Sequence, residues 1–580
     1  MKDNKKDTIF KIFNRIKVYK LQLILSLILA IVNVGFTLYI NILVGLAIDN
    51  IIDQGNVNFE AVMSTLTLIA ICALTVGISQ WIMTMINNKI TYSVVKNLRD
   101  DVFEHIQKLP LKYLDGNSSG SIVSKIITDI DQFAEGLLLG FTKLLTGIMT
   151  IIGTLIFMVY VNWAIALVVV CITPLSFVVA NFIAKRSHSL FKLQSEIRGE
   201  QTSIIDEAIG ELKVVKAFNQ EEEILEKFDE VNDRLQYCSV KAIFISSITN
   251  PATRFVNSIV YAGVCLSGSI AAISGGFTVG SLTIFLSYAN QYTKPFNEIS
   301  GVIAEVQNAL ACAKRVFDLL EEPKLIDENK KDLDLNKVKG EIEIKNLEFS
   351  YSDDKELIKN FNLKVPAGAK VAIVGPTGCG KTTIINLLMR FYKAQSGEIL
   401  IDGVNIKDIS YNKLRSCFGM VLQDTWLKAG TIKENIMLSK PNATDEEIIN
   451  AAKFAHAHSF IRRLPKGYDT EIGQAGGSLS QGQKQLLCIA RAVLAIPSML
   501  ILDEATSSID TMTEMQIQKA FDKMMIGRTT FIVAHRLSTI KKADVILVMK
   551  DGKIIENGNH EELLKNNGFY ANLYHSQFKK

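Results

Sequence analysis

Residues 375–382 read Gly375-Pro376-Thr377-Gly378-Cys379-Gly380-Lys381-Thr382, a complete G-x-x-x-x-G-K-T phosphate-binding loop. In such a loop the glycines let backbone N–H groups wrap the phosphates, Lys381 brings a charge to the β- and γ-phosphates, and the Thr382 hydroxyl ligates Mg²⁺. The flanking sequence predicts a buried strand at 370–374 and a helix at 383–390, whose N-terminus points at the phosphates. The sequence therefore predicts an ATP-binding α/β domain of the P-loop type.

The chain is too long for one hydrophobic core. It has 580 residues, of which 21% are charged, and its mean hydropathy is positive. This combination is typical of an apolar membrane part joined to a polar enzyme part. The formal net charge of +4 is too small to indicate nucleic acid as a partner. No C-x-x-C occurs among the eight cysteines, so neither a disulfide framework nor a structural zinc site is predicted.

Six apolar stretches in the first part of the chain are each near the roughly 20 residues that cross a bilayer as a helix. They lie at Leu21–Ile48, Ala61–Ile86, Leu137–Val161, Ala164–Ile183, Ala252–Ser274 and Val279–Ile303. The last is the least apolar. We predict an α-helical six-span transmembrane domain over residues 1–322, a linker over 323–340 and the α/β domain over 341–580.

The basic residues predict the orientation in the membrane. Seven Lys and Arg residues precede the first span, whereas 21–88, 144–184 and 255–293 contain none. Because cytoplasmic loops are enriched in Lys and Arg, the N-terminus, the ATP-binding domain and the two long connections are expected on the cytoplasmic side. A bacterial cytoplasmic membrane is the expected location.

The two long connections predict helical hairpins that extend into the cytoplasm. Apolar residues recur at helical spacing in both of them. They are Val94, Val95, Leu98, Val102, Ile106 and Leu109 in the first, and Ile204, Ile205, Ala208, Leu212 and Val215 in the second. Candidate tips are Lys112–Gly116 and Gly210–Val214, and an ordinary solvated loop is the alternative.

Polar residues inside predicted spans are candidates for lining an interior pathway, because polar groups are costly in lipid. They are Gln80, Asn257, Ser258, Asn290 and Gln291. Hydrogen bonding between helices is the alternative for each of them. No intramembrane Asp/Glu relay stands out, so ATP rather than a proton gradient is the expected energy source.

The second part of the chain carries further candidates for ATP chemistry. Tyr351 follows an alternating strand at 341–349, where it would stack on adenine or serve as an ordinary sheet tyrosine. The apolar run 498–504 ends in two carboxylates. Asp503 would hold Mg²⁺ through water and Glu504 would polarise the attacking water, because phosphoryl transfer depends on positioned charge and a positioned nucleophile.

A short segment before this acidic strand carries a family resemblance. Leu479-Ser480-Gln481-Gly482-Gln483 is close to the L-S-G-G-Q signature of ATP-binding-cassette (ABC) proteins. The whole chain resembles a bacterial ABC exporter half-transporter of the multidrug and lipid exporter type. The resemblance implies that Gln423 senses Mg²⁺ and the membrane domain, that Ser508-Ile509-Asp510 is the D-loop, and that His535 contacts the γ-phosphate.

Motif and resemblance together imply a full site with ATP and Mg²⁺ as cofactors. The implied ATP contacts are Tyr351, Gly375, Pro376, Thr377, Gly378, Cys379, Gly380, Lys381, Thr382, Thr383 and Gln423. The implied Mg²⁺ contacts are Thr382, Gln423 and Asp503, and Glu504 and His535 are implied to be catalytic. The signature residues Ser480, Gln481, Gly482 and Gln483 would cap ATP bound to a second subunit, with Ser508 and Asp510 in the D-loop. The hairpin tips resemble coupling helices, which dock on the cassettes of a dimeric assembly.

Two residues depart from the family pattern, and a third, Cys379, raises a separate question of regulation. Gln481 replaces a consensus glycine and resembles one branch that often works as heterodimers, so a second half-transporter is favoured as partner while a homodimer stays open. Gln474 replaces a glutamate often found in the export-specific loop, which puts a charge-based contact there in doubt. Cys379 could act as a redox brake, although many small residues fit its position.

The predicted function is ATP-driven export of amphipathic or hydrophobic compounds by alternating access, with multidrug efflux favoured. The alternative is a flippase or exporter of lipid or lipid-linked cargo that works as a homodimer. Membrane lipid and a small amphipathic substrate are the other expected partners. Six spans oppose a soluble ABC ATPase, Glu504 and His535 oppose a channel that uses ATP only as a ligand, and the fusion of both parts in one chain opposes an importer.

Overall fold

The computed structural model describes residues 2–51, 57–274, 277–325, 338–351, 357–422, 425–473, 477, 479–503, 509–533 and 537–578. The chain divides into two compact units. The membrane unit comprises Met1–Gln107 and Asn117–Glu322, and the cassette unit comprises Lys108–Gly116 and Pro323–Lys580. The predicted first hairpin tip thus groups with the cassette rather than with the helices that carry it.

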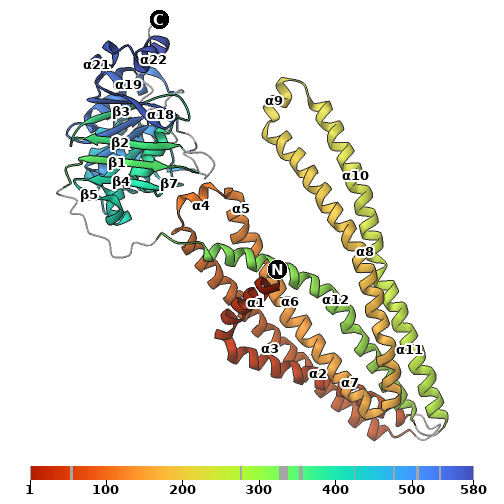
Figure 1. Cartoon of the computed structure of the whole chain (residues 1–580). Helices are drawn as coiled ribbons and strands as arrows, with labels where there is room; N and C mark the ends of the chain where they lie inside the picture. Colours follow the sequence, from red (N-terminus) through yellow and green to blue (C-terminus); the bar gives the residue numbers. More distant parts are fainter. Residues whose placement is uncertain are drawn as a thin grey trace. The chain divides into compact units, whose positions relative to one another are not determined.

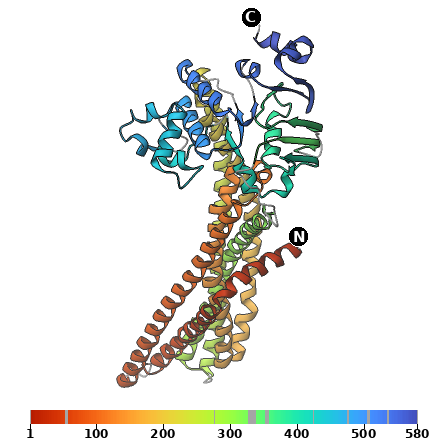
Figure 2. The ribbon, with the colours of Figure 1, turned by 90° about the vertical axis from the view of Figure 1, so that its left-hand side faces the viewer.

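The membrane unit is built from long helices that lie alongside one another (Figures 1 and 2). Its helices are α1 (Lys2–Ile16), α2 (Lys20–Asp49), α3 (Phe59–Ile106), α5 (Ser119–Ser124), α6 (Ile130–Leu139), α7 (Leu145–Val161), α8 (Trp163–Gly210), α9 (Leu212–Ala217), α10 (Glu221–Ser247), α11 (Thr249–Ile273) and α12 (Val279–Glu321). Two π-helical segments, Lys125–Asp129 and Gly140–Leu144, interrupt the path from α5 to α7. Such π-bulges are frequent at functional sites.

Four stretches are long and apolar enough to cross a membrane, by length and composition within the described residues. They are Lys6–Asp49, Phe59–Ile106, Ser119–Val161 and Glu221–Ile273. The first three contain the first three predicted spans, and the last contains the fifth except for its final residue, Ser274. The predicted fourth and sixth spans lie in α8 and α12, which are also long helices. The composition of the chain thus supports a transmembrane region, while the count of six spans stays a prediction.

Both long connections are helical, as their apolar periodicity predicts. Val94, Leu98 and Val102 are buried along α3, which continues well past the predicted span. Helices α8 and α10 form a hairpin with the short helix α9 at its tip (Figure 1). A small apolar cluster that includes Ile197 and Val231 packs these two helices together. The alternative of solvated loops is therefore wrong for these two connections.

Polar side chains inside the predicted spans have different surroundings. The Ser258 hydroxyl donates to the carbonyl oxygen of Arg254 at 3.0 Å. This hydrogen bond lies within one helix and does not join two helices. The side-chain oxygens of Asn257 and Gln291 are buried and have no hydrogen-bond partner among the described residues. Gln80 and Asn290 are exposed. A role in an interior pathway stays a prediction for all five residues.

The cassette unit contains a six-stranded sheet in the order β12-β11-β3-β10-β9-β6. Its strands are β3 (Lys370–Val374), β6 (Phe418–Val421), β9 (Met499–Asp503), β10 (Thr529–Val533), β11 (Val545–Lys550) and β12 (Lys553–Gly558). All neighbours pair in parallel except β11 and β12. The carboxyl ends of β3, β10 and β9 therefore meet at one edge, where ligands bind in open α/β sheets.

A four-stranded antiparallel sheet, β2-β1-β4-β5, lies beside it in the same unit. Its strands are β1 (Ile342–Phe349), β2 (Ile358–Val365), β4 (Ser396–Ile401) and β5 (Val404–Asn405), and β7 (Gly430–Thr431) pairs separately with β8 (Glu471–Ile472). One apolar cluster joins β1, β2 and β4 to one face of the six-stranded sheet and to α13 (Lys381–Leu388). A second apolar cluster packs α18 (Gln481–Ala495) and α19 (Thr511–Met524) against the opposite face of the six-stranded sheet.

The remaining helices of the cassette unit are short. They are α4 (Leu111–Asp115), α14 (Tyr411–Ser416), α15 (Ile432–Met437), α16 (Asp445–Phe454), α17 (His458–Ile461), α20 (Leu537–Lys541), α21 (His560–Lys565) and α22 (Phe569–Phe578). The predicted strands at 341–349, 370–374 and 498–504 agree with β1, β3 and β9 to within a residue at each end. The predicted helix at 383–390 is α13, which begins two residues earlier because the phosphate-binding loop itself provides the N-cap.

Candidate active site

The phosphate-binding loop connects the end of β3 to the start of α13. Gly380 is the N-cap of α13 with φ of 101°, and Gly378 has φ of 82°, a region that side chains rarely adopt. A Cβ at Gly375 would lie 2.2 Å from the carbonyl oxygen of Met549, so this position also requires glycine. The Lys381 Nζ donates to the carbonyl oxygens of Gly375 and Pro376 at 2.7 and 2.9 Å. The loop is thus curled around its own cation at a helix N-terminus.

One cavity of about 500 Å³ brings most of the predicted ATP contacts together. It is lined by Tyr351, Leu357, Thr377, Gly378, Gly380, Lys381, Thr382, Thr383, Asp503 and Val533. Asp503 comes from the end of β9, two strands from β3 in the sheet, so the parallel order brings this carboxylate to the loop. Hydroxyl and carboxylate oxygens are the ligands that Mg²⁺ prefers. The pair Thr382 and Asp503 therefore fits a Mg²⁺ ion, which would neutralise phosphate charge when bound with ATP.

Several predicted site residues lie outside the described residues: Gln423, Glu504, Ser508 and His535, and also Gln474. Their neighbours are nevertheless placed. Asp503 ends β9 directly before Glu504, and Val533 ends β10 directly before residues 534–536. The roles of Glu504 and His535 in catalysis stay predictions from the sequence.

The signature segment forms the start of α18. Ser480 is its N-cap, and the Ser480 hydroxyl and the Gln483 amide side chain form a capping box with each other's backbone N–H. Gly482 is buried, and a Cβ there would lie 2.5 Å from the Thr513 side chain of α19. Gln481 is exposed, and its side-chain amide donates to the Thr425 hydroxyl at 3.2 Å. The capping role of Ser480 and Gln483 was not part of the prediction, although the S-x-x-Q spacing is a known signal for it.

Asp510, predicted in the D-loop, is the N-cap of α19. Its carboxylate accepts from the Thr513 backbone N–H at 2.9 Å. This hydrogen bond lowers the pKa of Asp510 below its ordinary value. The residue therefore fixes the start of the helix that packs against Gly482, whatever it does toward a second subunit.

Burial raises the pKa of the Cys379 thiol, and nearby Lys381 opposes this only in part. The thiolate is the reactive form of cysteine, so a buried thiol with a raised pKa is a poor redox sensor. The structure thus favours a packing role for Cys379 over the redox brake.

A cluster of aromatic rings links the predicted adenine-stacking residue to the tip of the first hairpin. Tyr351 and Tyr392 meet edge to face with ring centroids 4.9 Å apart, and Phe349 contacts both rings. The Tyr351 hydroxyl also bonds to Thr383 at 3.3 Å. The buried Tyr392 hydroxyl in turn donates to the Asp115 carboxylate at the end of α4. Burial and this hydrogen bond raise the pKa of Tyr392.

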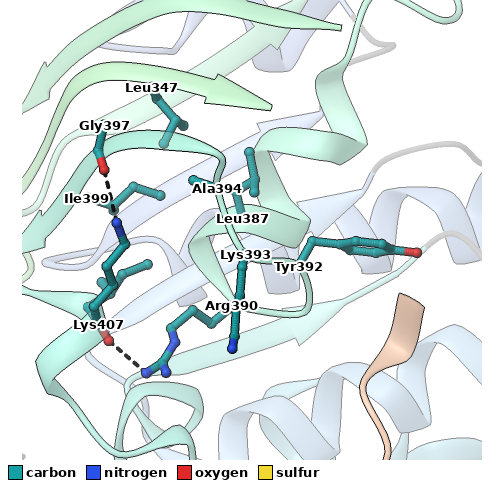
Figure 3. A pocket seen from close by; sticks show the side chains of 10 residues that line it. Leu347, Leu387, Arg390, Tyr392, Lys393, Ala394, Gly397, Ile399 and Lys407 are labelled. Atoms are coloured by element: carbon teal, nitrogen blue, oxygen red, sulfur yellow. Dashed lines mark hydrogen bonds between the residues drawn. The ribbon is translucent and has the colours of Figure 1, made fainter. Parts of the chain in front are cut away.

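Tyr392 also borders a separate cavity of about 260 Å³, which Arg390, Leu347 and Ile399 line beneath the antiparallel sheet (Figure 3). The Arg390 guanidinium donates to the carbonyl oxygens of Ile406 and Ile409 and so connects the end of α13 to the segment that follows β5. In Figure 3 the Tyr392 ring points away from the other lining side chains. Sequence reasoning identified the hairpin tip but not Tyr392, because nothing in the pattern pairs residues so far apart.

Replacing Tyr392 with phenylalanine is expected to loosen α4 and leave nucleotide binding nearly unchanged. The change removes the hydroxyl that donates to Asp115 but keeps the ring against Tyr351. A hydrogen bond to a charged group contributes about 1.5 to 3 kcal/mol. Transport per ATP hydrolysed should fall, while the KM for ATP stays within about twofold because an edge-to-face ring contact survives.

The matched control is Tyr468→Phe, which removes a hydroxyl bonded to His458 elsewhere in the cassette unit. Equal transport-to-hydrolysis ratios in the two variants would show that the Tyr392 hydroxyl has no coupling role. The ratio is best measured in proteoliposomes with ATP in excess.

Two protein-family models match the chain. The model described as the ABC transporter transmembrane region matches residues 23–296, and the model described as ABC transporter matches residues 358–507. A relative in Mycobacterium bovis, named a fatty acid ABC transporter ATP-binding/permease protein, is 41% identical over 90% of this chain and 83% of its own length. The chain belongs to the ABC transporter family.

Other relatives cover its whole length. An ATP-dependent lipid A-core flippase of Desulfotalea psychrophila is 36% identical over 99% of this chain and all of its own length. An uncharacterized ABC transporter ATP-binding protein of Bacillus subtilis is 38% identical over 99% of this chain and 95% of its own. The solved structure of a bacterial Atm1-family ABC exporter with ATP bound superposes with a TM-score of 0.82, at 26% identity over 97% of this chain and 99% of that one.

These similarities confirm the predicted family. The protein is a bacterial ABC half-transporter, with a helical transmembrane region followed by an ABC ATPase domain. It is an ATPase coupled to transport, and an ATP-driven exporter in general type.

Proposed function

We propose that this ABC transporter exports amphipathic, lipid-like compounds across the bacterial cytoplasmic membrane as half of a dimer. The observation that carries the proposal is its similarity, over 90% and 99% of the chain, to relatives named for fatty acid and lipid A-core. Multidrug efflux, the class favoured from the sequence, requires a similar apolar pathway. The names of these relatives support the lipid class over it.

Two surfaces of the chain, the signature segment and the tip of the second hairpin, support the proposal of a dimer. A signature segment at a helix N-terminus is an anion site, and that of α18 begins at Ser480, outside the residues that line the chain's own ATP cavity. The tip of the second hairpin also exposes large apolar side chains at Ile209, Leu212, Val214 and Phe218. Apolar patches of this kind mark interaction sites. We infer that α9 docks on the cassette of a second subunit.

We assign hydrolysis to three residues on the basis of the sequence. Glu504 would orient the attacking water, His535 would contact the γ-phosphate, and Gln423 would report Mg²⁺ binding to the membrane unit. ATP bound between two cassettes then stabilises the closed dimer more than the open one, which is the differential affinity that a population shift requires. Release after hydrolysis would return the transporter to its inward-facing state.

The nature of the second subunit is a separate proposal. The glutamine at position 481 led to the expectation of a heterodimer with a sister half-transporter. In the structure its amide is bonded to Thr425 of the same cassette. A Gln481 side chain that is held against its own cassette need not obstruct ATP bound to the facing cassette. Two copies of this chain could then form working sites, so a homodimer is the second candidate.

The experiment is lipid translocation by the purified chain in proteoliposomes. ATP-dependent movement of a fluorescent fatty acid or phospholipid across the bilayer, absent in Glu504→Gln, would support the lipid class. Hydrolysis without movement of either lipid would contradict it. A chain that binds ATP but hydrolyses none alone would point to a heterodimer, and robust hydrolysis by the chain alone to a homodimer.

A further inference from the structure

The cavity of Figure 3 is distinct from the ATP site. Its volume of about 260 Å³ is near the lower end of the roughly 300 to 1,000 Å³ found for small-molecule pockets, and it shares no lining residue with the cavity at the phosphate-binding loop. We call it the Arg390 cavity. Much of its wall is apolar, with Leu347 of β1, Leu387 of α13 and Ile399 of β4 among the lining residues. This wall suits the apolar part of a small ligand.

The charged side chains of the Arg390 cavity are all basic. Arg390, Lys393 and Lys407 line it, and no Asp or Glu is among the lining residues. The Lys407 Nζ donates to the carbonyl oxygen of Gly397 at 3.3 Å. Arg390 and Lys393 form no ion pair with any acidic residue that the structure describes. An anionic ligand therefore complements the charge of this cavity, whereas a neutral or cationic one does not.

The Arg390 guanidinium is held by contacts that leave one of its edges unused. Its Nη1 donates to the carbonyl oxygens of Ile406 and Ile409 at 2.9 and 2.8 Å, and its Cζ lies 3.9 Å from the centre of the Tyr411 ring. Its Nε and Nη2 donate to no atom that the structure describes. Two neighbouring guanidinium nitrogens match the two oxygens of a carboxylate, with two parallel hydrogen bonds. The Nε–Nη2 edge of Arg390 is thus prepared for a carboxylate.

Arg390 occupies a position where a charged side chain is costly. It follows Met389, the C-cap of α13, with φ of 51°, a conformation that glycine adopts more readily. The residue is 9% exposed, and a buried cation costs free energy unless it is paired. The hydrogen bonds to Ile406 and Ile409 explain where the guanidinium lies, and they compensate its charge only in part because both acceptors are neutral. An anion in the cavity would complete the compensation.

We propose that the Arg390 cavity binds a small amphipathic carboxylate, a ligand of the cassette unit that is neither ATP nor the exported compound. The carboxylate bonds to the Nε–Nη2 edge of Arg390, and its apolar chain packs on the apolar wall. Lys393 supplies a second cation, since its side chain extends in the same general direction as Arg390 in Figure 3. Tyr392 lines the same cavity and donates to Asp115 at the end of α4, so the ligand lies beside that contact. The site does not depend on which compound is exported.

The test is photolabelling of the full-length protein in nanodiscs of zwitterionic lipid. The probe is octanoate that carries a diazirine near the end of its chain, and mass spectrometry identifies the labelled peptides. We expect labels on peptides that contain Leu347, Leu387 or Ile399. Octanoate should compete at concentrations about tenfold lower than methyl octanoate, because a hydrogen bond to a charged group contributes at least that factor. ATP should not compete, because the two cavities share no lining residue.

Three variants separate the charge of the site from its shape. Arg390→Lys keeps the charge but removes the planar fork, and should weaken competition by octanoate about tenfold. Lys393→Gln should weaken it less, about threefold, because this side chain is exposed and its charge is screened. Ala394→Phe fills the cavity without removing a cation, and should abolish labelling of the three peptides. The matched control is Lys519→Gln, an exposed lysine on α19, which should leave labelling unchanged.

Four results would overturn the site. They are equal competition by octanoate and methyl octanoate, stronger competition by octyl phosphate than by octanoate, displacement of the probe by ATP, and labels confined to the membrane unit. The last result would leave the proposed export of lipid-like compounds standing. Variants are compared at a thermal midpoint equal to that of the wild type, and if Arg390→Lys does not fold, Lys393→Gln and Ala394→Phe decide.

Discussion

Lys381→Ala is expected to abolish ATP hydrolysis by this transporter, with a loss on the order of 100-fold or more in kcat, as for other groups that stabilise charge in the transition state. The Lys381 amine is the cation at the centre of the phosphate-binding loop, within hydrogen-bond distance of two loop carbonyls. No other cation lines the described part of that cavity. Developing charge on the transferred phosphoryl group would then lack its nearest protein cation. Phosphate release by the purified protein in nanodiscs measures the loss.

The fold should survive this change. The carbonyls of Gly375 and Pro376 that lose their donor lie at a partly exposed loop, where water can replace the amine. The control is Lys364→Ala, which breaks only a surface pair with Glu341 and should leave hydrolysis within about twofold, because exposed pairs contribute little. An unchanged thermal midpoint in Lys381→Ala would assign the loss to chemistry. Retained hydrolysis would contradict the placement of Lys381 at the phosphates.

The cassette could be predicted closely from the sequence because its chemistry is local. A phosphate-binding loop needs glycine where φ is positive, as at Gly378 and Gly380, and these requirements are written in consecutive residues. The acidic end of β9 is equally visible as an apolar run followed by a carboxylate. Its place next to the loop follows from the parallel sheet, where the ends of neighbouring strands meet.

Pairings between distant residues could not be predicted. Tyr392 and Asp115 are far apart in the chain, and each is unremarkable in its own segment. Lys143 lies inside the predicted third span, where the pattern gives no reason for a cation until Glu298 is found beside it. The bond from Gln481 to Thr425 likewise depends on how two loops approach each other. Such contacts are tertiary, and composition and periodicity carry no information about them.

Arg315→Gln is expected to destabilise the membrane unit by about 2 kcal/mol, less than the 3 to 5 kcal/mol for a fully buried pair because the arginine is half exposed. The Arg315 guanidinium donates one hydrogen bond to each Asp129 carboxylate oxygen, at 2.5 and 2.8 Å. This fork raises the pKa of Arg315. Asp129 is the last residue of the π-helical segment between α5 and α6, and Arg315 lies on α12. The ion pair therefore connects this segment to α12. The thermal midpoint in nanodiscs measures the loss.

The two ends of this pair should not be equivalent. The Asp129 side chain is 8% exposed and that of Arg315 is 51% exposed. Removing the arginine leaves a carboxylate in a nearly dry site, whereas Asp129→Asn leaves a guanidinium that water can solvate. Arg315→Gln should therefore lower the thermal midpoint more than Asp129→Asn does. The double variant should have a higher midpoint than Arg315→Gln alone, close to that of Asp129→Asn, because it leaves no buried charge. Equal losses in the two single variants would show that burial of the carboxylate does not set the energy of the pair.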